Sequence, residues 1–191
     1  CEVPIKNDDE LLDESFDPGD WFSSKDLRKV DDFIIFGVAA AEMAIKDSLL
    51  ANSNYNPSRI GVGVGSGVGG LPSIEQASLT LAEKGPKRVS PFFIPGALIN
   101  LVAGQISIRN NFKGPNLASV TACSSGTHSI CEGAEMIRRG KADDVIVESP
   151  AERLRKGSEM TSNLPFLKIF APGAKAFNSS ASKSRCRASS G

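Results

Sequence analysis

The residues best suited to chemistry lie at 119–130, where Cys123 stands among small residues. Residues 116–120 form a short apolar approach typical of a strand, and a helical pattern follows from residue 125. This strand, tight turn and helix would place the Cys123 sulfur at the tip of the turn, facing the first-turn N–H groups of the helix. Such groups favour a thiolate over a thiol. The pattern is that of a nucleophile elbow with Cys in place of Ser. The residues alone leave open a buried, inert cysteine.

A glycine-rich loop at 65–70, Gly-Ser-Gly-Val-Gly-Gly, matches the GxGxxG pattern between a predicted strand and a predicted helix. A dinucleotide site also needs an acidic residue about 20 positions further on, at the end of a second strand. Here that region is predicted to be a helix followed by Lys84-Gly85-Pro86. The other interpretation is a glycine turn that lets a second segment or an apolar ligand come close.

Composition excludes several classes of protein. The chain has 191 residues, 40% of them apolar, with 22 basic and 22 acidic residues, so no nucleic-acid partner is expected. Four cysteines without CxxC spacing and one histidine, His128, predict no metal site, no cofactor and free thiols in a reducing compartment. The longest apolar run, 33–41, is too short to span a membrane, and no signal peptide is visible. Since the chain starts at Cys1, we expect the native sequence to be longer.

The elements that must position these residues alternate between strands and helices, which predicts an α/β fold. Ser23 and Asp26 fit a capping box. Helices are predicted at 31–50, 73–84, 96–109 and 125–139, strands at 59–64, 116–120 and 144–148, and an apolar connector at 91–95. Helix 31–50 is apolar nearly all round, which predicts burial on several sides. Gly140 is placed to end the last helix.

Residues 149–191 differ in composition, being rich in Ser, Ala, Lys and Arg with one apolar run, 164–170. We therefore expect a domain at 1–148, whose first 20 residues form an irregular lead-in. A divergent tail follows at 149–191. No internal repeat is visible.

Several segments together are similar to a known family. They read LRKVDDFI (27–34), IGVGVGSGVGGL (60–71), VSPFFIP (89–95), INLVAG (99–104), KGPN (113–116) and VTACSSG (120–126). In order and spacing they resemble the β-ketoacyl-acyl-carrier-protein synthases of fatty-acid synthesis, particularly the type II elongating condensing enzymes. The resemblance extends from about Phe16 to Val147.

The resemblance implies a thiolase-like fold layered α-β-α-β-α, of which this chain would hold the N-terminal half, and a homodimer. It makes Cys123 the nucleophile that takes an acyl chain from acyl-carrier protein as a thioester. Malonyl-acyl-carrier protein is then decarboxylated, and its carbanion attacks the thioester and lengthens the chain by two carbons. The Cys123 N–H would supply half of an oxyanion hole.

Further roles follow from the same resemblance. Val68, Leu71 and Ala122 would line the acyl pocket, and Phe93 would reach into the pocket of the partner subunit. Basic residues would dock the acidic carrier protein, namely Lys25, Arg28, Lys29, Lys87 and Arg88. The expected location is the bacterial cytoplasm, or an organelle matrix in a eukaryote.

The chain departs from the family in two respects. The family uses one Cys and two His, the latter in later glycine-rich motifs, whereas His128 stands at a different position and is expected to make local contacts. We therefore expect no condensation by this chain alone. The resemblance also stops near Glu148, which suggests a truncated product or a shifted reading frame. Besides nucleotide binding, a non-catalytic partner of a complete synthase subunit stays open, although such partners often lack the cysteine.

Overall fold

The computed structural model describes residues 16–48, 50, 54–148 and 168–170. The helices in these ranges are α1 (Ser24–Leu27), α2 (Asp32–Asp47), α3 (Leu71–Lys84), α4 (Phe93–Ala97), α5 (Asn100–Asn110) and α6 (Ser125–Arg138). The strands are β1 (Ile60–Gly65), β2 (Asn116–Ser119), β3 (Asp144–Glu148) and β4 (Lys168–Phe170). Short 3-10 turns are η1 (Pro18–Asp20), η3 (Pro57–Arg59) and η4 (Pro86–Arg88).

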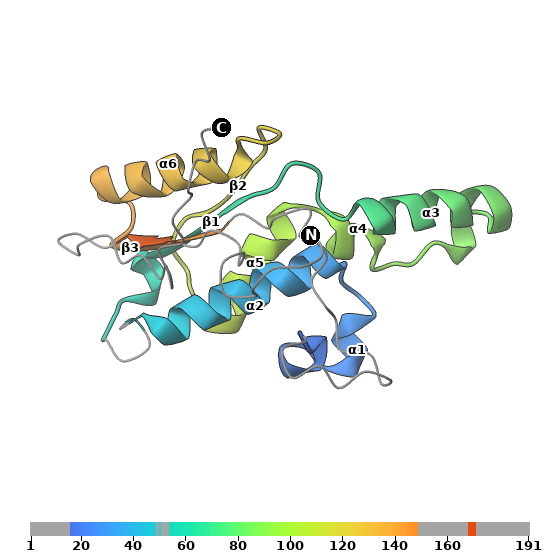
Figure 1. The fold of residues 1–191 in the computed structure, drawn as a ribbon, viewed down its shortest axis with the longest axis horizontal. Coiled ribbons are helices and arrows are strands. Elements are labelled where there is room, and N and C mark those ends of the chain that lie inside the picture. Colours follow the sequence, from blue (N-terminus) through green and yellow to red (C-terminus); the bar gives the residue numbers. More distant parts are fainter. Residues whose placement is uncertain (1–15, 49, 51–53, 149–167, 171–191) are drawn as a thin grey trace, which may run out of the picture.

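The strands form one sheet in the order β2-β1-β3-β4. Strands β2, β1 and β3 are parallel, with Val62 of β1 opposite Asn116 on one side and Ile146 on the other. Strand β4 is antiparallel to β3. Helix α6 contacts one face of this sheet, whereas α2 and α5 lie on the other (Figure 1). The predicted α/β fold is confirmed, and the described part comprises a helix layer on each side of the sheet.

The sequence of β1, Ile-Gly-Val-Gly-Val-Gly, divides the strand between these two layers. Side chains alternate between the faces of a strand. Ile60, Val62 and Val64 are buried in the larger apolar core with residues of α2 and α5. The three glycines face α6: a Cβ atom added to Gly63 would lie 3.2 Å from Ser129 Oγ. The glycines therefore let α6 pack directly on the backbone of β1.

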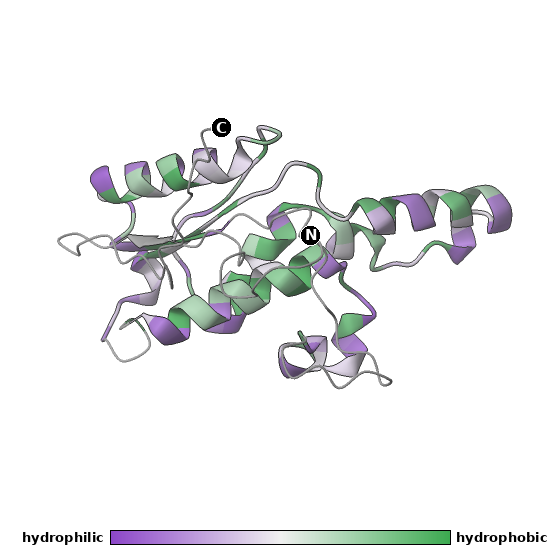
Figure 2. Cartoon of the chain, viewed as in Figure 1, coloured by the Kyte–Doolittle hydropathy of each residue, from purple (hydrophilic) through white to green (hydrophobic). Residues whose placement is uncertain are grey.

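The larger core explains why helix α2 is apolar nearly all round. Its side chains pack against α5 and the sheet, and Ile34 and Val38 are fully buried. Figure 2 shows α2 mostly in the green of apolar residues. Asp31 caps the helix by accepting a hydrogen bond from the N–H of Phe33 at 3.4 Å. A smaller cluster between α6 and the sheet contains Met136 and Val145. The predicted burial of this helix on several sides is confirmed.

One element prediction was wrong. The sequence predicts a connector at 91–95 and a single helix at 96–109, whereas the structure has α4 beginning at Phe93 and a break at Leu98 before α5. The break has a physical cause. The carbonyls of Gly96 and Ala97 accept tertiary hydrogen bonds from the N–H groups of Asp31 and Gly70, both at 3.0 Å.

Other boundaries agree with expectation within a few residues. Ser23 caps α1 with Asp26 as its partner, and Gly140 follows α6 with a φ of 65°. Residues 1–15 of the lead-in and most of the tail, including Cys1, Cys186 and 164–167, lie outside the described residues. None of the helices in the described ranges combines the length and apolar character that crossing a membrane requires.

Candidate active site

Cys123 lies in the turn between β2 and α6, at the carboxyl end of the parallel strands. The turn is closed by backbone hydrogen bonds from Ser124 N–H to the Thr121 carbonyl at 3.0 Å and from Ser125 N–H to the Ala122 carbonyl at 3.1 Å. Ala122 has a φ of 48°, in the left-handed region that a residue with a Cβ rarely adopts. Such strained residues concentrate at functional sites. The predicted order of strand, tight turn and helix around Cys123 is confirmed.

The buried hydroxyl of Ser125 ties both sides of this turn together. Its Oγ donates a hydrogen bond to the Ala122 carbonyl at 2.7 Å and accepts one from the Thr121 N–H at 2.9 Å. Ser125 is 3% exposed, so water does not compete for these bonds. Sequence reasoning treated Ser125 only as one small residue among several.

The end of β1 packs against the elbow. A Cβ atom on Gly65 would overlap the backbone carbonyl of Ser125, so only glycine allows α6 to start there. The N–H of Ser66 donates to the carbonyl of Ser119 at 3.3 Å, which joins the ends of β1 and β2. The glycine turn therefore brings a second segment close, as the second interpretation of the loop expects.

The environment of Cys123 suits a nucleophile. The cysteine is free and exposed, and it directly precedes Ser124, the N-terminal cap of α6. The Ser124 side chain makes no capping hydrogen bond, so it does not satisfy the first-turn N–H groups of the helix. Amide groups at a helix start attract negative charge, such as a thiolate or a developing oxyanion.

His128 makes only local contacts. Its Nδ1 lies 3.4 Å from Thr121 Oγ1, and its Nε2 lies 3.6 Å from Glu132 Oε1, one helical turn further along α6. These contacts agree with the expectation from the sequence. The other free cysteine in the described ranges, Cys131, is also exposed on α6.

The residues expected to line an acyl pocket lie on four different segments. Val68 is in the glycine loop and is 51% exposed, and Leu71 begins α3 and is 59% exposed. Phe93 begins α4 and is half-buried, and Ala122 is exposed in the elbow. The structure packs the loop and α4 against each other, since Gly70 N–H donates to the Ala97 carbonyl at 3.0 Å.

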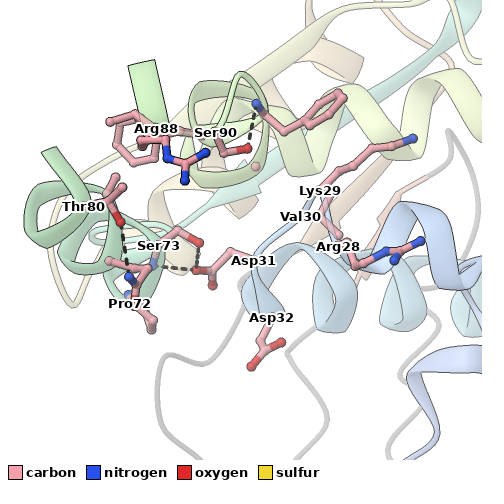
Figure 3. A pocket seen from close by; sticks show the side chains of 16 residues that line it. Arg28, Lys29, Val30, Asp31, Asp32, Pro72, Ser73, Thr80, Arg88 and Ser90 are labelled. Carbon is pink, nitrogen blue, oxygen red and sulfur yellow. Dashed lines mark hydrogen bonds between the residues drawn. The ribbon is translucent and has the colours of Figure 1, made fainter. Parts of the chain in front are cut away.

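A cavity of about 550 Å³ lies beside these elements, between the turn that precedes α2, the start of α3 and the η4–α4 segment (Figure 3). Three of the five expected docking residues line it, Arg28, Lys29 and Arg88, whereas Lys25 and Lys87 do not. Phe93 lines it as well, but Val68, Leu71 and Ala122 do not.

The cavity wall also contains polar contacts that sequence reasoning missed. Asp31 Oδ2 accepts hydrogen bonds from Ser73 Oγ at 2.6 Å and Ser73 N–H at 3.1 Å (Figure 3). Burial, followed by the neighbouring Asp31 charge, raises the pKa of Asp32. Lys29 is 2.6 Å from Asp26 and also lies over the ring of Phe92. The sequence signal for Asp31 is its place directly before a long apolar helix, but its partner is 42 positions away.

The segments around this site correspond to a known domain. The family model "Beta-ketoacyl synthase, N-terminal domain" matches residues 3–151. The chain belongs to this family. The predicted resemblance is thereby confirmed.

Curated ketoacyl synthases show the same relationship. Over 158 residues, the chain is 46% identical to a 3-oxoacyl-[acyl-carrier-protein] synthase 2 of Rhizobium meliloti, covering 81% of this chain and 37% of that protein. A Vibrio cholerae protein of the same name is 47% identical over 135 residues, covering 71% and 33%. The chain therefore spans about a third of the length of these relatives.

Solved ketosynthases share the fold. A type II polyketide ketosynthase in complex with its acyl-carrier protein has a TM-score of 0.64 at 28% identity, over 70% of this chain and 39% of that chain. A beta-ketoacyl synthase from Burkholderia phymatum has a TM-score of 0.61 at 26% identity, over 74% and 35%. These comparisons support neither the nucleotide-binding alternative nor the non-catalytic partner.

Proposed function

We propose that this ketosynthase-family chain supplies the acyl-accepting part of a 3-oxoacyl-acyl-carrier-protein synthase, with Cys123 as the nucleophile. The observation that carries the proposal is the free, exposed Cys123 in a strained turn at the start of α6. Family membership supports the same assignment.

The chemistry of the first half-reaction follows from this placement. The Cys123 thiol loses its proton, and the thiolate attacks the carbonyl carbon of the thioester on the carrier protein, forming a carbon–sulfur bond. The oxygen that becomes negative accepts a hydrogen bond from a backbone N–H of the elbow. The intermediate then expels the carrier thiolate, which takes up a proton, and the acyl chain stays on Cys123. In the complete enzyme of this class, malonyl-carrier protein is decarboxylated and its carbanion attacks this thioester.

Acylation of Cys123 is the direct test. The 191-residue chain is incubated with octanoyl- and palmitoyl-carrier protein, and the mass of the intact chain is measured. We expect one acyl group on the wild type and none on Cys123→Ala. Cys131→Ala is the matched control, since it removes the other exposed thiol of the described ranges, and it should be acylated normally. Acylation that persists in Cys123→Ala would show that the nucleophile is wrongly assigned.

Condensation is expected to be absent from this chain. The family uses two histidines besides the cysteine, whereas this sequence has one, His128, whose ring nitrogens lie near Thr121 and Glu132. The acylated chain is therefore mixed with malonyl-carrier protein, and a β-ketoacyl product is sought by mass spectrometry. Formation of that product would contradict this part of the proposal.

Carrier-protein docking is assigned to the basic side of the cavity, formed by Arg28, Lys29 and Arg88. Opposite charge speeds association and depends on ionic strength. Arg28→Glu and Arg88→Glu should weaken carrier binding and reduce its salt dependence. Lys113→Glu, an exposed charge reversal on the turn before β2, is the control. If all three variants weakened carrier binding equally, the assignment of docking to this cavity would be wrong. Lys25 and Lys87 do not line the cavity, and their part in docking stays a prediction.

We propose that a second copy of the chain buries a set of exposed apolar side chains. These lie on or directly after the glycine loop, α3, α4 and the edge strand β2, and they are Val68, Leu71, Ile74, Ile94, Leu98, Leu117 and Val120. Exposed apolar area of this kind marks interaction surfaces. In such a dimer Phe93 would reach the partner's acyl pocket. Sedimentation should give twice the monomer mass, and a monomer at all concentrations would contradict the homodimer.

The free thiols of Cys123 and Cys131 fit a reducing compartment, the cytoplasm of a bacterium or an organelle matrix.

A further inference from the structure

Helix α3 carries Leu71 at its start, yet hydrophobic burial does not hold this helix in place. None of its side chains is buried, and Leu71, Leu79 and Leu81 are all more than half exposed. In Figure 1 the helix extends away from the sheet. Something other than a hydrophobic core must therefore fix the position of its first turn.

The first turn of α3 is fixed by the carboxylate of Asp31. Oδ2 of Asp31 accepts hydrogen bonds from the Oγ and the N–H of Ser73, while Oδ1 accepts a hydrogen bond from the N–H of Phe33. One side chain thus joins the starts of α2 and α3 (Figure 3). Asp31 is only 9% exposed, and hydrogen bonds to a charged group away from water are among the stronger ones.

The backbone around Asp31 brings in the third segment, α4. Asp31 N–H donates to the Gly96 carbonyl at 3.0 Å, and a Cβ atom on Gly96 would overlap the Lys29 carbonyl. A Cβ atom on Gly70 would lie 2.9 Å from Asp31 Oδ2 and 3.0 Å from Ala97 Cα. The turn that precedes α2 and carries Arg28 and Lys29, the glycine loop and α4 therefore meet at Asp31.

We propose that Asp31 is a positioning residue, which holds the acyl-pocket residue Leu71 in fixed register with the docking residues Arg28 and Lys29. The roles of those three residues rest on the proposed function. Asp31 itself touches no reacting group. It determines where α3 starts, and so which acyl chains the pocket accepts once the carrier protein has docked.

Substitutions of both hydrogen-bonding partners test this role in the full 191-residue chain. Asp31→Asn weakens the bonds to Ser73 by removing the charge, and Ser73→Ala removes one donor. Ser73→Thr keeps the hydroxyl and should restore wild-type behaviour. Asp32→Asn is the matched control, since Asp32 lies in the same cavity wall and no hydrogen bond joins its side chain to α3 in the described contacts.

The first measurement is amide hydrogen exchange, which needs no substrate. In Asp31→Asn and Ser73→Ala, exchange over 71–76 should be about tenfold faster, as expected for the loss of one charge-assisted hydrogen bond. Exchange at the start of α6 should not change. Equal acceleration in α3 and α6, or an equal effect of Asp32→Asn, would reduce Asp31 to a general stabilising residue and overturn the proposal.

The second measurement is the ratio of Cys123 acylation rates with octanoyl- and palmitoyl-carrier protein. We expect this ratio to shift by about threefold or more in Asp31→Asn, with Ser73→Thr matching the wild type. A uniform slowing with an unchanged ratio would overturn the specificity role. If the wild-type chain is not acylated at all, the proposed function fails, and hydrogen exchange alone still decides whether Asp31 positions α3.

Discussion

The elbow that carries Cys123 and the helix that carries Leu71 are held in place by different means. The elbow rests on buried backbone: β1 is buried along its whole length, and α6 packs against its glycines. Helix α3 has no buried side chain and is attached at its first turn through Ser73 and Gly70. This difference is consistent with the proposed roles, since a nucleophile needs a fixed position, whereas a helix proposed to border an acyl chain can be fixed at one end.

The largest expected effect on stability comes from Gly65 of β1, against which α6 begins. Gly65→Ala places a methyl group on the backbone carbonyl of Ser125, and backbone cannot move aside as a flexible side chain can. The variant should lose at least about 4 kcal/mol of stability or fail to fold, measured by urea unfolding followed by circular dichroism.

Gly104→Ala is the control for this substitution. Gly104 lies within α5, and the nearest atom to an added Cβ is 4.0 Å away. Since alanine is the better helix former, this variant should be neutral or more stable by up to about 1 kcal/mol. A folded Gly65→Ala chain with near-normal stability would show that α6 is not seated on β1 in the way described.

The second effect concerns Glu148, at the end of β3 on the face of the sheet that α2 and α5 cover, where a Cβ atom added to Gly37 would lie 2.9 Å from Glu148 Oε1. Its carboxyl is fully buried, and neither oxygen has a hydrogen-bond partner among the residues that the structure describes. Burial raises its pKa from 4.5 to about 8. Between these values the folded chain keeps a proton that the unfolded chain has released. The free energy of unfolding should therefore fall as pH rises through this window, by about 1.4 kcal/mol per pH unit at its middle.

Glu148→Gln should remove most of this dependence and be more stable than the wild type at pH 9. Asp32 and Asp144, whose pKa values are raised first by burial and then by a neighbouring aspartate, contribute in the same direction in both chains. Glu83→Gln, on the exposed side of α3, is the control and should leave the pH profile unchanged. Identical profiles for wild type and Glu148→Gln would contradict a buried, neutral Glu148.

The third prediction compares the truncation of one apolar side chain in β3 with the truncation of one in α3. Ile146→Ala removes a fully buried side chain of β3 and should cost about 2–5 kcal/mol. Leu79→Ala removes a side chain of α3 that is 51% exposed and should cost less than about 1 kcal/mol in a monomer. Unfolding midpoints of both variants at one protein concentration provide the measurement. A large cost at Leu79 that grows with protein concentration would instead place a second copy of the chain on α3.

Local patterns were enough to predict the strand, turn and helix around Cys123, but not the packing of α6 on the glycines of β1 or the attachment of α3. The difference has a physical reason. The alternation in β1, the apolar run of α2 and the small residues around Cys123 each report on neighbours within a few positions. The break at Leu98 depends on carbonyls that bind Asp31 and Gly70, far away in the sequence. The Asp31–Ser73 bridge is likewise a long-range contact. The left-handed Ala122 carries no glycine signal, because tertiary packing rather than residue type imposes that conformation.

At the far end of α3, conformation and not packing requires glycine. Gly85 ends the helix with a φ of 77° and a ψ of 172°, and nothing lies within 4 Å of an added Cβ. Gly85→Ala should cost about 1–3 kcal/mol of local strain. Because α3 has no buried side chain, we expect the cost to be released by fraying of the last turn, so that the global midpoint moves by less than this. Faster amide exchange over 79–85 with unchanged exchange at 71–76 would show this release, whereas a midpoint shift as large as that of Ile146→Ala would mean that α3 is integral to the fold.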